Sequence, residues 1–201
     1  MKDKGYKRKG KLFYKIEHSM AFCIEFEIPS QLLYVAFYVL PLYIPHENRN
    51  LTYGIRQQFN GVKIRRNAQG KQIADDVCWH EEFLDYADTY IFPWFDRIRN
   101  CGDLIAAMEN QGKKKTDCSD IHMLKLQYFT FAFCGEYEKA LQIAPKYRKL
   151  IQTTTWLTDT VKKMLYNELD TVCDLLEGDH EAIVAWFEQT IKNSITSCAL
   201  H

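Results

Sequence analysis

The stretch from Ala21 to Pro45, AFCIEFEIPSQLLYVAFYVLPLYIP, constrains the fold of this chain more than any other part of it. A helix needs about 20 uninterrupted apolar residues to cross the hydrocarbon core of a bilayer. Glu25 and Glu27 interrupt the first part of the stretch, and Pro29 and Pro41 break the remainder. We therefore expect this stretch to form the core of a folded protein and not a membrane span.

The first third of the chain carries the two-residue period of β-strands. In AFCIEFEI, residues 21–28, apolar and polar side chains alternate between two faces, and KLFYKIE before it has the same period and ends in the polar turn Glu17-His18-Ser19. LLYVAFYVL, residues 32–40, is apolar on both faces, as in a central strand. LTYGIR is a candidate fourth strand, and IRRNAQGKQ can close a further hairpin. These patterns predict an antiparallel β-meander of about four strands.

After Trp79 the period changes to that of a helix. WHEEFLDYADTYI is amphipathic, Pro93 stops or kinks it, and a short helix at DLIAAMEN follows. Ser119 or Asp120 is the expected cap of the next helix. Residues 124–141 and 167–184 align without gaps, which places Gly135 on Gly178. The sequence therefore predicts an α+β fold with five or six helices and two αα-hairpins, each turning at a left-handed glycine.

The 201 residues fit one domain, 1–201, although charge divides the chain into two parts. Residues 1–71, the β-rich part, hold 13 Lys and Arg against 5 Asp and Glu, whereas the helical residues 72–201 hold 13 against 21. The two parts can dock on each other, or the basic part can face a polyanion. Seven scattered cysteines without a CxxC pair, and no signal peptide, predict free thiols in the cytoplasm.

Catalytic motifs are absent from the sequence. It has no GxxxxGK[ST], GxSxG, HExxH or GxGxxG, so we assign no catalytic residue and expect no cofactor. The densest group of metal-ligand residue types lacks the paired spacing of zinc sites and lies where acidic residues favour a helix start. That group comprises Asp75, Asp76, Cys78, His80, Glu81 and Glu82. We therefore predict no metal site.

Aromatic and basic residues of the sheet are the candidate binding residues. Tyrosine is enriched where proteins bind each other, so a tyrosine-rich face favours a protein partner. Its candidate members are Tyr34, Tyr38, Tyr43, Tyr53 and Arg56. The basic segment KDKGYKRKGKLFYK, with Lys7 and Arg8, together with Arg65 and Arg66, could instead bind single-stranded nucleic acid, an interpretation that we rank below protein binding.

The order of four segments resembles a bacterial family, the domain-of-unknown-function family 4304. These segments are GYKRKGKLFYK, PLYIP, LTYGIR and IFPWFDRI. The resemblance implies a β-meander followed by helices in a bacterial cytoplasm, and it brings no activity, cofactor or catalytic residue. Similar proteins carry a helix before the glycine-aromatic segment, whereas here only four residues precede Gly5. Either this helix is absent or the start lies upstream, and a sheet face left uncovered would favour a homodimer.

These observations favour a non-enzymatic protein-interaction module, of the toxin-neutralising sort among others. The alternative is an enzyme, such as a hydrolase acting on a nucleotide or nucleic acid. A pocket that gathers Glu25, Glu27, His80 or Arg56 would favour this alternative.

Overall fold

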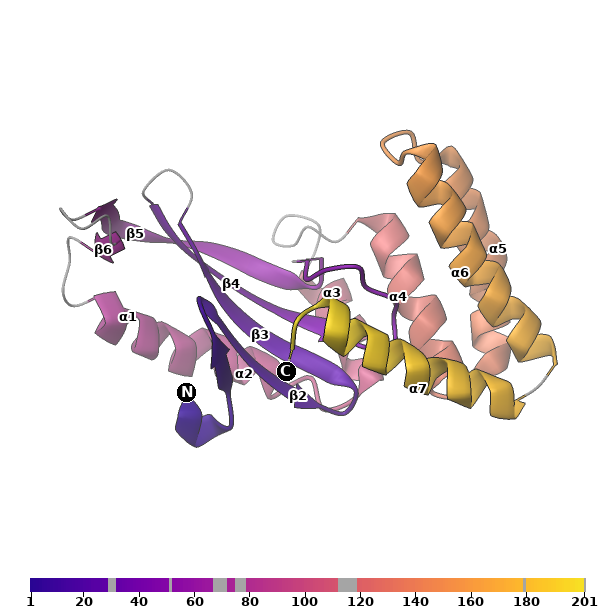
Figure 1. The fold of residues 1–201 in the computed structure, drawn as a ribbon, viewed down its shortest axis with the longest axis horizontal. Coiled ribbons are helices and arrows are strands. Elements are labelled where there is room, and N and C mark those ends of the chain that lie inside the picture. Colours follow the sequence, from indigo (N-terminus) through magenta and orange to yellow (C-terminus); the bar gives the residue numbers. More distant parts are fainter. Residues whose placement is uncertain are drawn as a thin grey trace. The chain divides into compact units, whose positions relative to one another are not determined.

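The computed structural model describes residues 1–28, 32–50, 52–66, 72–74, 79–111, 119–178 and 180–200, with backbone alone at 59–66, 72–74 and 111. The chain forms two compact units (Figure 1). Unit 1 comprises Met1–Leu40 and Leu51–Asp117, and unit 2 comprises Pro41–Asn50 and Cys118–His201. The chain therefore passes between the units three times. The expectation that both units fold together as a single domain stays a prediction.

Unit 1 is built on an antiparallel sheet whose strand order follows the chain. Within the described ranges it has six strands, in the order β1-β2-β3-β4-β5-β6. They are β1 (Lys7–Lys9), β2 (Leu12–Glu17), β3 (Met20–Glu27), β4 (Leu32–Pro41), β5 (Gly54–Arg66) and β6 (Gln72–Ala74), preceded by the 3₁₀ turn η1 (Lys2–Lys4). The predicted meander is confirmed. The short edge strand β1 was not predicted, and the expected turn at Asn67–Gly70 lies outside the described residues.

The helical elements of unit 1 cover one face of this sheet. They are α1 (Trp79–Tyr86), the π-helix η3 (Ala87–Ile91), α2 (Phe92–Phe95) and α3 (Cys101–Gln111). The ring of Phe22 in β3 lies 5.3 Å from that of Phe95, and the ring of Phe26 lies 4.8 Å from that of Phe83. The predicted apolar face of β3 is therefore the one that packs on the helices, which follow one another along the sheet in Figure 1. The chain stays helical through Pro93, so this proline does not end the helical run.

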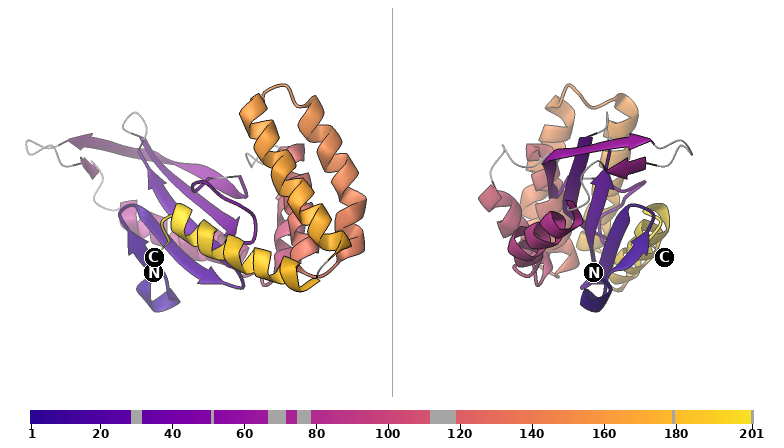
Figure 2. Two further views of the ribbon diagram at one scale, coloured as in Figure 1. Left: turned by 45° about the vertical axis from the view of Figure 1, so that its right-hand side comes forward. Right: turned by 90° about the vertical axis from the view of Figure 1, so that its left-hand side faces the viewer.

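Unit 2 contains four longer helices and the segment 41–50. They are α4 (Asp120–Phe133), α5 (Tyr137–Thr153), α6 (Asp159–Glu177) and α7 (His180–Ser197). Figure 2 shows α5 and α6 side by side. The two predicted αα-hairpins, α4–α5 and α6–α7, are present, and α4 begins directly after its N-cap Ser119 as expected.

The glycine turns of the two hairpins differ. Gly135 has a φ of 78°, in the left-handed region, as predicted. Gly178 has a φ of −119°, so the prediction of a left-handed residue is wrong for the second hairpin. There the N–H of Gly178 donates to the carbonyl oxygen of Leu175, which closes the helix in a tighter turn without positive φ.

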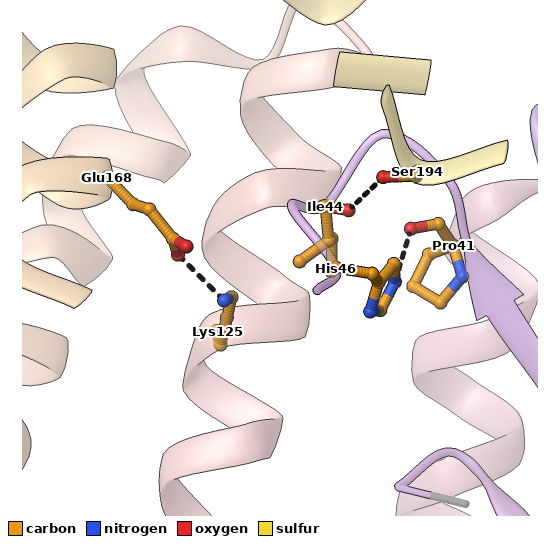
Figure 3. Close-up of polar contacts among 6 residues, drawn as sticks. All are labelled: Pro41, Ile44, His46, Lys125, Glu168 and Ser194. Atoms are coloured by element: carbon orange, nitrogen blue, oxygen red, sulfur yellow. Dashed lines mark hydrogen bonds and ion pairs between the residues drawn. The ribbon is translucent and has the colours of Figure 1, made fainter. Parts of the chain in front are cut away.

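Polar contacts tie the segment 41–50 to the helices of unit 2 (Figure 3). Ser194 Oγ in α7 donates to the carbonyl oxygen of Ile44 at 3.0 Å, and Nε2 of His46 lies 3.1 Å from the carbonyl oxygen of Pro41. Lys125 Nζ in α4 lies 2.7 Å from Glu168 Oε2 in α6. The Ser194 hydrogen bond joins the segment to α7, the His46 contact lies within the segment, and the Lys125–Glu168 pair joins α4 to α6.

Among the helices in the described ranges, none combines the length and apolar character needed to cross a membrane.

Candidate binding cleft

A cleft of about 690 Å³ opens in unit 1 where three parts of the chain meet. The N-terminal turn contributes Asp3 to Tyr6, and the β2–β3 hairpin contributes Lys15, Glu17, His18 and Phe22. The region of α2 contributes Phe92, Phe95, Asp96, Ile98 and Arg99. Its volume lies within the range typical of small-molecule sites. The cleft is therefore large enough to receive one or a few side chains or a small ligand.

The floor of the cleft is aromatic. The rings of Tyr6 and Phe92 lie 5.9 Å apart, and Phe22 and Phe95 make the edge-on pair described above. Phe92 and Phe95 are three residues apart in one helical turn, so both can face the sheet. Because the π-helix η3 leads directly into α2, the placement of these two rings depends on that non-standard turn.

Tyr6 brings a polar atom to this apolar floor. Its side chain is 8% exposed, and its hydroxyl makes no hydrogen bond with any residue that the structure describes. Burial raises the pKa of Tyr6 well above its ordinary value, and the acidic side chains of Cys23, Glu17 and Asp96 raise this pKa further. The hydroxyl stays protonated at every physiological pH, and no described residue bonds to it, so a ligand in the cleft can form a hydrogen bond with it.

The rim carries charges of both signs. Lys4 Nζ lies 3.3 Å from Asp88 Oδ1 and 4.3 Å from the centroid of the Phe92 ring. Lys15 Nζ lies 2.6 Å from Glu17 Oε1. In the described ranges, the carboxylates of two other lining residues, Asp3 and Asp96, form no ion pair. The lysines of the rim are therefore engaged with acidic side chains, while two of its carboxylates remain available.

The hairpin turn between β2 and β3, which the sequence predicted, borders the cleft. His18 and Ser19 have φ values of 50° and 59°. Two successive residues in the left-handed region define the type I′ hairpin turn, where Asn-Gly is the favoured sequence. The His18 carbonyl lies 4.0 Å from Cys101 Sγ, and its imidazole makes no hydrogen bond or ion pair within the described part of the chain. This turn therefore holds a histidine side chain at the cleft.

The predicted tyrosines lie mostly in the core. Tyr38, Tyr43 and Tyr53 are at most 3% exposed, and only Tyr34 is partly exposed. The Tyr38 hydroxyl donates to Glu25 Oε2 at 2.7 Å. Tyr43 belongs to unit 2, whereas the other three belong to unit 1. Three of the four rings are thus core side chains and do not present the flat exposed face that the sequence suggested.

Arg56 and Glu27, two of the residues whose gathering in a pocket would favour the enzyme alternative, form an ion pair on the sheet but do not line the cleft. Arg56 Nη2 lies 2.7 Å from Glu27 Oε2, and its Cζ lies 4.2 Å from the centroid of the Tyr34 ring. His80 lies on α1 with its side chain largely exposed, and its contacts in the described ranges are with Trp79 and Glu81. The structure therefore joins only part of the set proposed for a hydrolase.

The predicted basic residues are only partly described. Lys7 and Arg8 are exposed on β1, where Arg8 Nε donates to the carbonyl oxygen of Gly10 at 3.1 Å. The side chains of Arg65 and Arg66 in β5 lie outside the described residues, as do Asp75, Asp76 and Cys78. In the part of the chain that was searched, no group of three or more His, Cys, Asp or Glu side chains could hold a metal ion.

The cleft was not predicted from the sequence, although the sequence contained a signal for it. Two of the four segments that carried the family resemblance, GYKRKGKLFYK and IFPWFDRI, both supply lining residues. Tyr6 and Lys15 come from the first segment, and Phe92, Phe95 and Asp96 come from the second. Segments that are far apart in the sequence and distinctive in composition meet at one site.

No protein-family model, curated protein or solved structure matches this chain. Membership of family 4304 stays a prediction, and function must be argued from the geometry of the cleft.

Proposed function

We propose that this chain is a non-enzymatic binding protein that receives part of a partner protein in the cleft of unit 1. The observation that carries the proposal is the aromatic floor with the unpartnered Tyr6 hydroxyl. A recess of this kind gives an inserted side chain both apolar contact area and a hydrogen bond. The charged rim around the floor then supplies specificity, because a wrong partner leaves buried charges unpaired.

The cellular setting belongs to the same proposal. We place the chain in the bacterial cytoplasm as a member of family 4304, with a toxin among the partners to be considered. The five cysteines in the described ranges are thiols, which is the state expected in a reducing compartment. Identification of the partner tests this setting directly.

The test is a pull-down with tagged full-length protein from a lysate of the native host, carried out with and without nuclease. The cleft variant replaces Asp3 and Asp96 by asparagine, and Asp85→Asn on the exposed face of α1 is the matched control. We expect a stoichiometric protein that the wild type and the control retain and that the cleft variant retains at least tenfold less. Circular dichroism and the melting temperature show that the variants are folded.

Two results would contradict the proposal. Equal retention of the partner by the cleft variant would place binding elsewhere on the chain. Recovery of nucleic acid in place of protein, removed by nuclease and by Lys7→Ala with Arg8→Ala, would support the polyanion interpretation of the basic strand instead.

A further inference from the structure

Acidic side chains surround the Tyr6 hydroxyl, although the cleft as a whole is lined by three acidic and three basic residues. The carboxylates that act on this hydroxyl are those of Glu17 and Asp96. The faces of aromatic rings also carry partial negative charge, because the ring quadrupole is negative above its plane. A group that lies over the face of Phe92, beside Tyr6, therefore meets the negative face of the ring and these carboxylates.

One cation of the chain already uses this surface. Lys4 Nζ lies 4.3 Å from the centroid of the Phe92 ring, within the distance of a cation–π contact. The Lys4 side chain is half exposed, and its ion pair with Asp88 is a surface pair, which contributes little to stability. Moving Lys4 away from the Phe92 ring therefore costs little free energy, so a cationic ligand can take its place.

Two carboxylates of the cleft have no cationic partner. Asp3 and Asp96 form no ion pair, and the Tyr6 hydroxyl, which can accept as well as donate, makes no hydrogen bond, in each case counting the described residues only. Lys15 is paired with Glu17 at 2.6 Å, and Arg99 Nε donates to the carbonyl oxygen of Asp96 at 3.4 Å. A ligand that complements the vacant groups donates hydrogen bonds and carries positive charge.

We infer that the cleft binds a basic side chain, a lysine ammonium or an arginine guanidinium, over the face of Phe92, beside the Tyr6 hydroxyl and against the carboxylate of Asp96. The partner protein as the source of this side chain rests on the proposed function, whereas the sign of the ligand charge rests on the cleft alone. Phe92 supplies the cation–π face, Tyr6 accepts a hydrogen bond, and Asp96 neutralises the charge.

Binding of blocked amino acids to the full-length protein tests this inference. The probes are Nα-acetyl-lysine amide and Nα-acetyl-arginine amide, the matched neutral probe is Nα-acetyl-norleucine amide, and the anionic probe is inorganic phosphate. Nuclear magnetic resonance titration measures each Kd and identifies the perturbed amides. We expect at least one cationic probe to bind tenfold or more tightly than norleucine amide, with shifts at Tyr6 and Asp96.

Substitutions separate a cation site from an anion site. We expect Asp96→Asn and Tyr6→Phe each to weaken binding of the cationic probe severalfold, and Asp85→Asn to leave it unchanged. Lys4→Gln should strengthen binding severalfold, because it removes the competing ammonium from Phe92. Weaker binding in Lys4→Gln, preferential binding of phosphate, or equal binding of norleucine amide would each overturn the inference.

The two proposals fail in different ways. If the cleft variant loses the partner protein but the probes show no preference for positive charge, the inference falls and the proposed function survives. If the cationic probes bind as expected but the cleft variant retains the partner fully, the proposed function falls and the inference survives. Absence of binding by every probe would count against the inference alone.

Discussion

At the scale of single residues, His46 is the group whose protonation should govern the acid stability of unit 2. The pKa of His46 is lowered to about 4, first by burial and then by the Lys125 ammonium, while the hydrogen bond to the Pro41 carbonyl opposes both effects. In the unfolded chain the pKa is about 6.5. As the pH falls from about 6.5 to about 4, the unfolded state takes up the proton first, so the free energy of unfolding decreases by about 3 kcal/mol.

Chemical denaturation between pH 4 and pH 7.5 measures this loss. We expect His46→Gln to be less stable than the wild type at pH 7.5 but to lack the His46 component of the acid destabilisation. His80→Gln, which replaces a largely exposed histidine on α1, should follow the wild-type curve. A pH dependence that is identical in His46→Gln and the wild type would show that His46 does not carry the effect.

Residue identity alone did not reveal which polar groups would be buried. The two-residue period of a strand places Tyr34 and Tyr38 on one face of β4, yet Tyr38 is buried with its hydroxyl hydrogen-bonded to Glu25, while Tyr34 is partly exposed. The same alternation could not assign an exposure to either ring, because exposure depends on what covers each end of the strand. The unpartnered hydroxyl of Tyr6 was invisible for the same reason.

At the scale of elements, the pairing of β4 with β5 requires a glycine at position 54. Gly54 pairs with Tyr38, and a Cβ at this position would lie 2.2 Å from the Tyr38 Cβ and 2.5 Å from the Phe37 carbonyl oxygen. Backbone and Cβ atoms cannot rotate away, so the strands must separate. We expect Gly54→Ala to reduce the free energy of unfolding by about 3 kcal/mol, which is the upper end of the usual range for overpacking.

Gly10→Ala is the matched control for this substitution. Gly10 has a φ of 60° and no neighbouring atom within 4 Å of an added Cβ, so alanine there meets backbone strain alone. We expect Gly10→Ala to reduce the free energy of unfolding by about 1 kcal/mol, measured by urea unfolding alongside Gly54→Ala. Equal losses in the two variants would contradict the steric explanation.

The ion pair between α4 and α6 should stabilise unit 2 only as an intact pair. The side chains of Lys125 and Glu168 are 13% and 14% exposed. Lys125→Met leaves a largely buried carboxylate without its partner, so we expect a loss of about 3 kcal/mol, most of which the double variant with Glu168→Leu should recover. Urea unfolding of the double-mutant cycle measures the coupling between the two side chains.

The exposed pair of Lys139 and Glu136 provides the comparison for this cycle. Their side chains are 61% and 42% exposed. Lys139→Met should change the free energy of unfolding by less than about 0.5 kcal/mol, because exposed ion pairs contribute little. A double variant of Lys125 and Glu168 no more stable than Lys125→Met would exclude the unpaired carboxylate as the cause.

Periodicity predicted the elements well because it is a local property. The strand at 21–28, the helix from Trp79 and the two αα-hairpins all follow from side chains that must share a face. The left-handed turn was correct at Gly135 and wrong at Gly178, because a glycine permits positive φ without requiring it. The continuation of β5 to Arg66 also exceeded the predicted strand LTYGIR, since pairing with its neighbours and not local pattern sets strand length.

At the scale of the whole molecule, Ser194 connects the segment 41–50 to α7. Both Ser194 and Ile44 are 1% exposed, so Ser194→Ala leaves the Ile44 carbonyl buried without its hydrogen bond. We expect Ser194→Ala to reduce the free energy of unfolding by about 2 kcal/mol. Hydrogen exchange should accelerate in residues 41–50 and in α7, while amides of β2 and β3 in unit 1 keep their rates.

Thr196→Ala is the control, because its exposed hydroxyl donates only to the Lys192 carbonyl oxygen of its own helix. It should change stability by less than about 0.5 kcal/mol. Uniform acceleration of exchange in both units of Ser194→Ala would contradict the local effect, and it would identify the single cooperative domain expected from the sequence.

The amino-acid pattern alone was enough to predict the α+β class, the antiparallel meander and the hairpins of the C-terminal half, because backbone geometry imposes periods of 2 and 3.6 on any chain that buries one face. The position of the cleft, in contrast, depends on tertiary packing. Tyr6 and Phe92 become neighbours through the pairing of β1 and β2 and the packing of α2 on β3. Such contacts join residues that are far apart in the sequence and depend on the tertiary packing of unit 1. A local sequence pattern carries no information about that packing.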